Sequence, residues 1–370
     1  MKKILVDAGT FYTKVYVLRQ AFQNGGEGSA DKSYEFYGRT FFPTLVGRAG
    51  DIDKSRIYYE HDGEWFSIGY DCSSSLELEQ IVKAFEDDGV GTGSRRLILK
   101  KIIYDFADHK DDLAIDVVVS DPRGIQVFEE IRAQLHDREI EITALRGYDR
   151  RRIKKEVKIR FRLLSAGEAI TGFLEKIKKD FRTALVVDVG YHRTKIYLVE
   201  CGKGVALFQI GDFGVSFFYE KIVNLCSEKK ITDNHFLWLV KQIEFGYKQV
   251  EVGGEDNRGV QKLGGLMTGD CTREYDISLV LDNVRWDLNK DIKRLTTDIL
   301  TSYYTNTTTW AEMLVVTGGG ASLNGDILCH SLVEDGYRFH DVYIEKQPIY
   351  TMLEGACRGL NTLQANRTPI

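Results

Sequence analysis

Two short segments of the sequence combine a carboxylate, a glycine, hydroxyls and a lysine within a few residues. The first consists of Asp7, Gly9 and Thr10, followed by Thr13 and Lys14. A turn that contains glycine exposes backbone N–H groups that can hold a phosphate, and hydroxyls and an ammonium group add further donors. A nearby carboxylate can hold a hydrated divalent cation such as Mg²⁺. Taken alone, the segment also fits an ordinary Asp-Gly turn.

The second segment repeats the first in the other half of the chain. The shared residues are Asp188, Gly190, Thr194 and Lys195, each 181 positions after its counterpart. Between them, His192 and Arg193 either lie over a phosphate or face solvent, and Tyr191 is a further candidate binding residue. Two turns built alike, one in each half, can hold a polyphosphate from both sides, with a metal ion between Asp7 and Asp188. This repetition favours binding over chance.

A third segment places three consecutive glycines directly after the apolar run at residues 313–317. Glycine permits a positive φ and the close approach of a flat ligand, and the helix that follows brings its N-terminus near phosphates. The candidate binding residues are Thr317, Gly318, Gly319, Gly320 and Ser322. The alternative is a flexible connector between a strand and a helix.

The elements that must position these segments can be read from the hydrophobic pattern. The two repeated turns lie between apolar runs that alternate at period two, which predicts β-hairpins over residues 4–18 and 185–199. Further strands are expected at 35–42, 56–69, 113–120, 156–163, 275–282 and 313–317. Helices are expected at 75–108, 124–136, 167–179, 215–228, 232–246 and 286–308. Strands followed by helices in two similar halves predict an α/β protein whose mixed sheets are covered by helices.

Composition excludes several classes of protein. The 370 residues are 43% hydrophobic and 28% charged, enough for two to three folded domains of about 150 residues. A net charge of −5 excludes a global basic field that would recruit nucleic acid or anionic lipid, although a local basic patch stays open. Six scattered cysteines indicate reduced thiols in the cytoplasm. With no signal peptide and no apolar run of about 18 residues, we expect a protein that is neither secreted nor membrane-spanning.

The three segments together resemble the signatures of the actin-like ATPase superfamily, which also contains sugar kinases and heat-shock chaperones. Residues 7–14 resemble its first phosphate loop, residues 188–194 its second, and residues 315–322 its adenosine loop. Residues 117–122 and 354–360 look most like ParM-type bacterial plasmid-segregation actins and their archaeal relatives. Similarity to the family also extends to the Phe-Pro-Thr segment at 42–47 and the hairpin at 62–69.

The resemblance implies a two-domain actin-like fold, a duplicated ribonuclease-H-like fold with a nucleotide cleft between the domains. Domain I would contain residues 1–166 and 346–370, and domain II residues 167–345. The two connecting helices would lie at 167–179 and 350–363. The implied ligand is ATP or ADP with Mg²⁺.

The family orients its hydrolytic water with a residue where the connecting strand meets its helix. Register by downstream residues places Ser165 at that position, whereas chemistry favours Glu168, the only carboxylate of the junction. Glu168 could instead be a first-turn helix residue that interacts with the helix dipole. Lys195 stands where the ParM-type pattern usually has an acidic residue, which weakens the case for a metal at the second loop.

The resemblance implies a cytoplasmic ATPase that polymerises with Mg-ATP into cytomotive or cytoskeletal filaments and depolymerises after hydrolysis, in plasmid or DNA segregation. Its partners would be copies of itself and a DNA-binding adaptor protein, with no direct nucleic acid and no evident membrane anchor. One alternative is a nucleotide-binding assembly adaptor of the division or pilus type, which would usually carry a terminal amphipathic anchor. The other is a small-molecule kinase, for which the sequence shows neither an aspartate base nor a sugar pocket.

Overall fold

A computed structural model describes twelve stretches of the chain: residues 1–9, 11–20, 33–73, 92–120, 122–177, 180–216, 266–268, 271–273, 278–304, 311–345, 350–357 and 361–363. The chain divides into two compact units. Unit 1 comprises Met1–Lys176 and Met352–Ile370, and unit 2 comprises Ile177–Thr351. Each unit contains its own mixed sheet, as expected for an α/β protein. Among the described residues, no helix is both long and apolar enough to cross a membrane.

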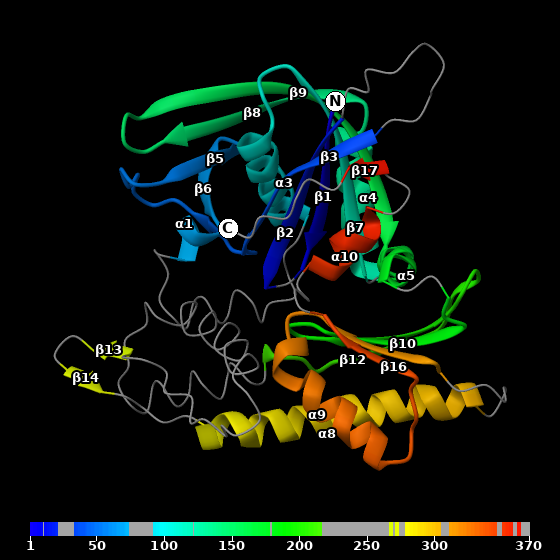
Figure 1. Cartoon of the computed structure of the whole chain (residues 1–370). Helices are drawn as coiled ribbons and strands as arrows, with labels where there is room; N and C mark the ends of the chain where they lie inside the picture. Colours follow the sequence, from blue (N-terminus) through cyan, green and yellow to red (C-terminus); the bar gives the residue numbers. More distant parts are fainter. Residues whose placement is uncertain are drawn as a thin grey trace, which may run out of the picture. The chain divides into compact units, whose positions relative to one another are not determined.

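Unit 1 is built on a ten-stranded sheet in the order β17-β3-β2-β1-β7-β9-β8-β5-β6-β4 (Figure 1). Its strands are β1 (Lys2–Ala8), β2 (Tyr12–Gln20), β3 (Ser33–Pro43), β4 (Val46–Arg48), β5 (Ile57–His61), β6 (Glu64–Ile68), β7 (Asp111–Val119), β8 (Arg138–Arg146), β9 (Arg151–Ser165) and β17 (Asn361–Leu363). Its helices are α1 (Tyr70–Ser73), α3 (Thr92–Phe106), α4 (Pro122–Leu135), α5 (Ala166–Ile177) and α10 (Thr351–Ala356).

The core of unit 1 follows from alternation along its central strands. Ile4 and Val6 on β1 and Ile115 on β7 are fully buried and pack with Ile102 of α3 and Ile131 of α4. Each such buried side chain contributes about 1.5–3 kcal/mol relative to leaving it exposed. Because β1 pairs in parallel with β7 and antiparallel with β2, the first turn is fixed at the end of a strand buried in the middle of the sheet.

The C-terminal end of α3 is fixed by a lysine from β9. The Lys155 ammonium donates hydrogen bonds to the carbonyls of Tyr104 and Ala107, at 2.6 and 2.7 Å. Helix ends leave carbonyls without partners inside the helix, and a lysine can satisfy them. Burial lowers the pKa of Lys155, although nearby carboxylates, Asp108 first, oppose the shift. This contact holds α3 in place and, with it, the arginine that α3 contributes to the first turn.

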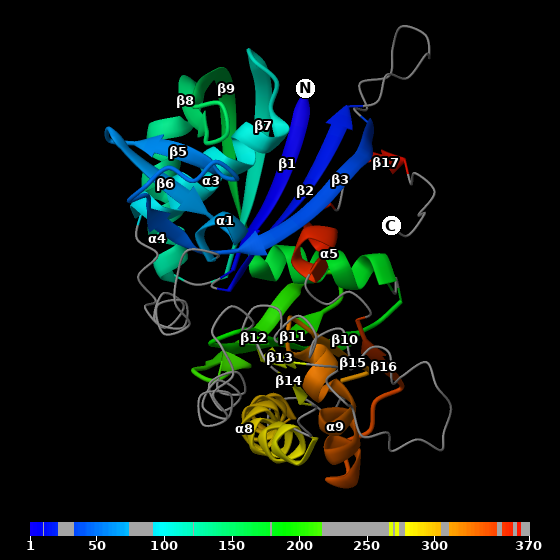
Figure 2. The same ribbon diagram turned by 90° about the vertical axis from the view of Figure 1, so that its left-hand side faces the viewer.

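Unit 2 contains a five-stranded sheet in the order β12-β11-β10-β15-β16. Its strands are β10 (Thr183–Val189), β11 (Thr194–Glu200), β12 (Gly204–Gly211), β15 (Met313–Thr317) and β16 (Asp341–Ile344). Two helices, α8 (Ser278–Tyr304) and α9 (Ala321–Glu334), lie on one face of this sheet in both views (Figures 1 and 2). A separate two-stranded sheet consists of β13 (Leu266–Thr268) and β14 (Cys271–Arg273).

The expected secondary structure is confirmed at the two hairpins and at most other expected elements that the structure describes, with the following corrections. Residues 278–282 begin α8 and are not part of a strand, because the apolar residues Val280, Val284 and Leu288 also recur every four positions, the spacing of a helix. The helix expected over 350–363 ends at Ala356, and residues 361–363 add a strand beside β3. Strands β4, β8, β12, β13, β14 and β16 had not been expected. The helices expected at 215–228 and 232–246 and the first part of 75–108 fall mostly outside the described residues.

The boundary between the units falls after Lys176, at the end of α5, whereas the sequence analysis divided the chain at residue 166. Helix α5 packs closely on α10, as Figure 2 shows. A Cβ added to Gly355 would lie 1.7 Å from the Ala169 carbonyl oxygen, so only glycine allows this approach. An ion pair of 2.8 Å between Lys176 and Glu354 joins the same two helices. These contacts keep α5 with unit 1.

Candidate functional site

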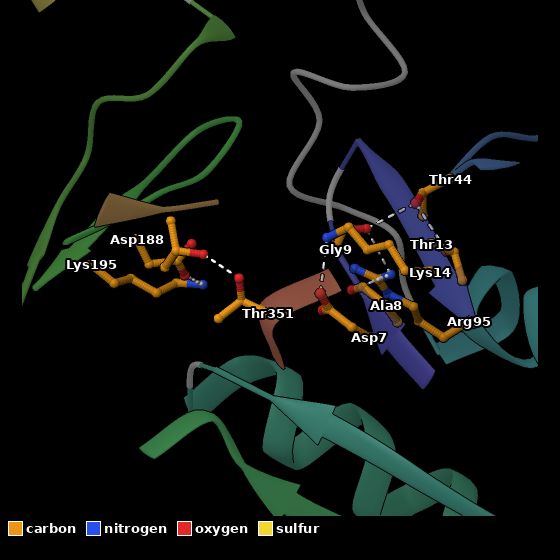
Figure 3. Close-up of polar contacts among 11 residues, drawn as sticks. Asp7, Ala8, Gly9, Thr13, Lys14, Thr44, Arg95, Asp188, Lys195 and Thr351 are labelled. Atoms are coloured by element: carbon orange, nitrogen blue, oxygen red, sulfur yellow. Dashed lines mark hydrogen bonds and ion pairs between the residues drawn. The ribbon is translucent and has the colours of Figure 1, made fainter. Parts of the chain in front are cut away.

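The first turn, between β1 and β2, places a carboxylate and an ammonium group side by side. Asp7 lies opposite Lys14 in the antiparallel register, and Lys14 Nζ donates to Asp7 Oδ2 at 2.9 Å (Figure 3). Both side chains are largely buried, 18% and 17% exposed. A Cβ added to Gly9 would lie 2.8 Å from the Tyr12 carbonyl oxygen, so the turn requires glycine there. Thr10 lies outside the described residues.

The carbonyl side of the first turn is held by donors from distant parts of the chain. Thr44 Oγ1 donates to the Gly9 carbonyl at 2.9 Å, and Arg95 Nη1 donates to the Ala8 carbonyl at 2.9 Å (Figure 3). Thr13 is fully buried, and its hydroxyl bonds Thr44 Oγ1 at 3.0 Å. The Thr13 hydroxyl, expected to face a phosphate, therefore has a partner inside the protein. Its role in the structure is to fix the turn.

The second turn, between β10 and β11, is fixed in the same way. Thr194 is fully buried, and its hydroxyl donates to the Phe213 carbonyl at 3.0 Å. The Val215 backbone N–H donates to the Gly190 carbonyl at 3.1 Å, where the first turn uses the Thr44 side-chain hydroxyl on the Gly9 carbonyl. In each case, the anchoring residue follows the strand that pairs with the second strand of the hairpin. The duplication read from the sequence thus extends to the anchoring of the turns.

Charge is arranged differently in the two turns. Lys195 Nζ lies 4.0 Å from Asp188 Oδ2, against 2.9 Å for the pair in the first turn (Figure 3). Asp188 is also more deeply buried than Asp7, with 11% of its side chain exposed. Beside it, the rings of Tyr191 and His192 meet edge to face at 4.6 Å and are partly exposed. The second turn therefore has a looser carboxylate–lysine pair than the first.

The glycine-rich segment lies directly against the second turn. Asp188 on β10 is opposite Thr317 on β15 in the parallel register. Gly318 has φ +84°, and a Cβ there would lie 2.4 Å from Asp188 Oδ1. The Gly320 N–H donates to the Val189 carbonyl at 2.9 Å. The second and third segments of the sequence therefore form one site in unit 2.

The middle glycine differs from its two neighbours. Within the described part of the chain, no atom other than those of its two neighbours lies within 4 Å of a Cβ added to Gly319, and its φ is outside the left-handed region. Thr317 is fully buried, and its hydroxyl shares a hydrogen bond with the Thr351 hydroxyl. The side chain of Ser322 is outside the described part of the chain. Internal packing therefore explains the glycines at 318 and 320. It does not explain the glycine at 319, which borders open space.

The two catalytic candidates bond each other at the start of α5. Ser165 N and Ser165 Oγ both donate to Glu168 Oε2 at 2.8 Å, and the Glu168 N–H donates to Ser165 Oγ at 3.1 Å. This reciprocal arrangement is a capping box, which satisfies backbone donors at a helix N-terminus. The geometry gives both residues a structural role at the start of the helix. For Glu168, this role is similar to the alternative of a first-turn residue that interacts with the helix dipole.

The carboxylates fit Mg²⁺ only in one mode of coordination. The described residues contain no cluster of three or more His, Cys, Asp or Glu side chains that could hold a metal ion by itself. Mg²⁺ usually keeps several waters and binds one or two carboxylates together with substrate phosphates. Asp7 and Asp188 suit that second mode, because each is a single carboxylate at the end of a strand.

Comparisons with known proteins bear on the fold. No protein-family model matches the sequence, and no curated protein matches it. Solved structures do match, over 96% of the chain. A complex with ADP of Ta0583, an archaeal actin homologue, is 14% identical with a TM-score of 0.62 over 97% of its length. A 15-stranded ParM filament from Clostridium botulinum is 12% identical with a TM-score of 0.62 over 97% of its length. An Alp12 filament is 18% identical with a TM-score of 0.53 over 96% of its length.

At these identities, the similarity establishes the fold alone. The chain has the two-domain actin-like fold, and this prediction of the sequence analysis is confirmed. Its structural relatives include the archaeal actin homologue and ParM, as the motifs implied.

Proposed function

We propose that this chain is an ATPase that binds Mg-ATP and assembles into filaments. One observation carries the proposal: the two hairpin turns share a construction in which an aspartate lies opposite a lysine and a buried threonine fixes the loop. Such a matched pair suits a polyphosphate, because phosphoryl transfer to water needs chiefly positioning and charge stabilisation. The filaments and the ADP complex among the structural relatives agree with this function.

Within this proposal, each part of the site has a role. The backbone of both turns and Lys14 bind the phosphates, while Asp7 and Asp188 bind waters of the Mg²⁺ shell. The glycine segment accepts the adenosine, with Gly319 closest to the ligand. The buried hydroxyls of Thr13 and Thr194 hold the turns in shape instead of contacting nucleotide.

Assembly is tested by right-angle light scattering and by electron microscopy of the purified protein with ATP, with ADP and without nucleotide. We expect scattering to rise on addition of Mg-ATP and to fall as phosphate is released. If the protein binds ATP but forms no polymer at any protein concentration, the proposed filament function is wrong and an assembly adaptor is favoured. Phosphate transfer to a metabolite in place of water would favour a kinase.

Hydrolysis is assigned to Glu168, which orients the attacking water from the start of α5, with Ser165 as the alternative. Glu168→Gln is the informative change, because glutamine also completes a capping box and the helix start survives. We expect near-normal ATP binding, with hydrolysis slowed by about 10²-fold or more, the usual cost of losing a positioned catalytic group. Filaments of this variant should last longer.

The control for this variant is Ser165→Ala. It breaks the cap and should cost about 0.5–2 kcal/mol of stability without slowing hydrolysis. If instead Ser165→Ala slows hydrolysis and Glu168→Gln does not, the catalytic position is Ser165. We further propose that the filaments act in plasmid or DNA segregation in the cytoplasm and bind DNA through an adaptor protein. Co-pelleting of candidate adaptors with the polymer tests this role.

A further inference from the structure

The positive charge of this acidic protein is concentrated in one ribbon. Residues 138–162, which form β8 and most of β9, contain ten Arg or Lys and four Asp or Glu, a net charge of +6 in a chain of net charge −5. All of β8 pairs with residues 151–159 of β9, and the two strands are joined by a short turn at the outer end of the ribbon (Figure 1). A strongly basic segment on an otherwise acidic protein indicates a local electrostatic function.

Three adjacent arginines at the turn have no counter-ion among the described residues. Arg150, Arg151 and Arg152 are exposed, and in the described part of the chain none of their guanidinium groups forms an ion pair or hydrogen bond. The one nearby acid of the turn, Asp149, is neutralised by Arg146 at 3.1 Å and accepts the Arg151 N–H at 3.1 Å. Three adjacent arginines are therefore available to an anionic partner.

Charges farther along the ribbon are more often balanced. Lys154 pairs with Glu141 at 2.8 Å, and Arg162 pairs with the buried Asp116 at 2.6 Å. Arg138, Lys158 and Arg160 also form no ion pair within the described residues, but they are separated along the strands. The turn is where three such charges are adjacent.

The turn is fixed and also carries aromatic surface. The Gly147 N–H donates to the Arg56 carbonyl at 2.9 Å, and the backbone there approaches Asp53 so closely that no side chain would fit on Gly147. Tyr148 is 66% exposed, and the Arg152 guanidinium lies 5.5 Å from the centre of the Trp65 ring. A rigid turn loses little conformational entropy when it binds a partner.

We propose that this arginine turn, residues 148–152, binds the phosphate backbone of a nucleic acid. The planar guanidinium group suits bidentate contact with phosphate, and an exposed aromatic ring beside it can stack on bases. A two-stranded ribbon also has the dimensions of the DNA major groove. A membrane fits less well, because residues 148–152 include no aliphatic side chain to insert between lipids. The binding goes beyond the proposed function, in which DNA is reached through an adaptor.

Fluorescence anisotropy with labelled duplex DNA, in the absence of nucleotide, tests the proposal. Each phosphate contact adds about 0.9 to the slope of log K against log salt, so three contacts add about 2.7. The comparison variant has Arg150, Arg151 and Arg152 all changed to Gln. When the salt concentration is raised fourfold, the DNA affinity of the wild type should fall by about 40-fold more than that of this variant. At low salt, the variant should bind much more weakly than the wild type.

The matched control changes Lys203, Lys290 and Arg294 of unit 2 to Gln. These side chains are 79%, 77% and 73% exposed, and the control has the same net charge as the arginine variant. It should keep the affinity and the salt slope of the wild type. Equal losses in the two variants would show a general charge effect and overturn the proposal, as would a wild type that does not bind DNA.

Two further arms complete the test. The protein should not bind vesicles that contain phosphatidylserine. If it binds these vesicles but not DNA, the partner of the arginine turn is a membrane and the proposal is wrong. Thermal unfolding should show both variants folded, because the changed side chains are exposed. Tyr148→Ala should lower the affinity for single-stranded DNA, because it removes a ring on which a base can stack. The slope of log K against log salt should not change, which separates aromatic from ionic contacts.

Discussion

The open space at Gly319 makes it the sharpest test of the nucleotide site. A Cβ added there meets no atom of the described residues within 4 Å, its chain neighbours apart, and a side chain requires no left-handed backbone. Gly319 is half-buried, and substitutions that disturb no packed group usually change stability by less than about 0.5 kcal/mol. For a protein of this size, that corresponds to a shift in Tm of about 2 °C or less. Gly319→Val should therefore fold as the wild type does.

Nucleotide binding should respond very differently. If the adenosine packs on Gly319, an inserted isopropyl group must be accommodated at a cost comparable to overpacking a core, about 1–3 kcal/mol. At about 1.4 kcal/mol per tenfold change, the affinity for ATP should fall by about 5- to 140-fold. Isothermal titration calorimetry measures the affinity, and thermal unfolding without nucleotide measures the fold.

The neighbouring glycines supply contrast and control for this prediction. Gly318→Ala places a Cβ 2.4 Å from Asp188 Oδ1 at a φ of +84°, so it should destabilise the protein as well as impair binding. Gly50→Val is the matched control, because Gly50 is equally open and lies in unit 1 outside the turns. Wild-type affinity in a folded Gly319→Val protein would refute the placement of adenosine on this segment.

Two other predictions concern charge. Asp7→Asn and Asp188→Asn should each reduce the gain in ATP affinity that Mg²⁺ produces, measured by titration with Mg²⁺ and with EDTA; an unchanged gain would remove these carboxylates from the metal site. Burial, and after it the Lys100 ammonium, lower the pKa of His61, so the unfolded chain binds a proton at a higher pH than the folded protein does. Stability should accordingly fall as the pH drops below about 6.5, and His61→Gln should flatten that fall in urea unfolding; parallel pH profiles would contradict the assignment.

The sequence predicted the parts of the fold in which local pattern and burial agree. The hairpins over 4–18 and 185–199 have period-two alternation and a glycine turn, and both formed as expected. Strand β8 was missed although Ile140, Ile142 and Ala144 alternate with Glu141 and Thr143, because the alternating stretch is short and follows the charged pair Arg138 and Glu139. Residues 278–282 were misassigned because a short apolar run is compatible with either a strand or a helix.

The anchoring of the turns could not be read from the sequence, since it depends on contacts between distant residues. Thr44 and Arg95 reach the first turn from 35 and 87 positions away, and no local spacing indicates which carbonyl they bind. Thr13 looked like a phosphate ligand because hydroxyls beside glycine turns often are. In a strand buried on both faces, alternation does not show which side chain meets solvent.

The start of α5 shows the opposite case, a local signal with two meanings. Ser165 and Glu168 have the spacing of a capping box, and a water-orienting carboxylate at a strand–helix junction occupies the same position. Both roles require the carboxylate to be held in one place, and the cap holds it with two hydrogen bonds from Ser165. A glutamate fixed in this way loses little entropy when it orients a water. The structural role therefore does not compete with catalysis but supplies the rigidity that catalysis would need.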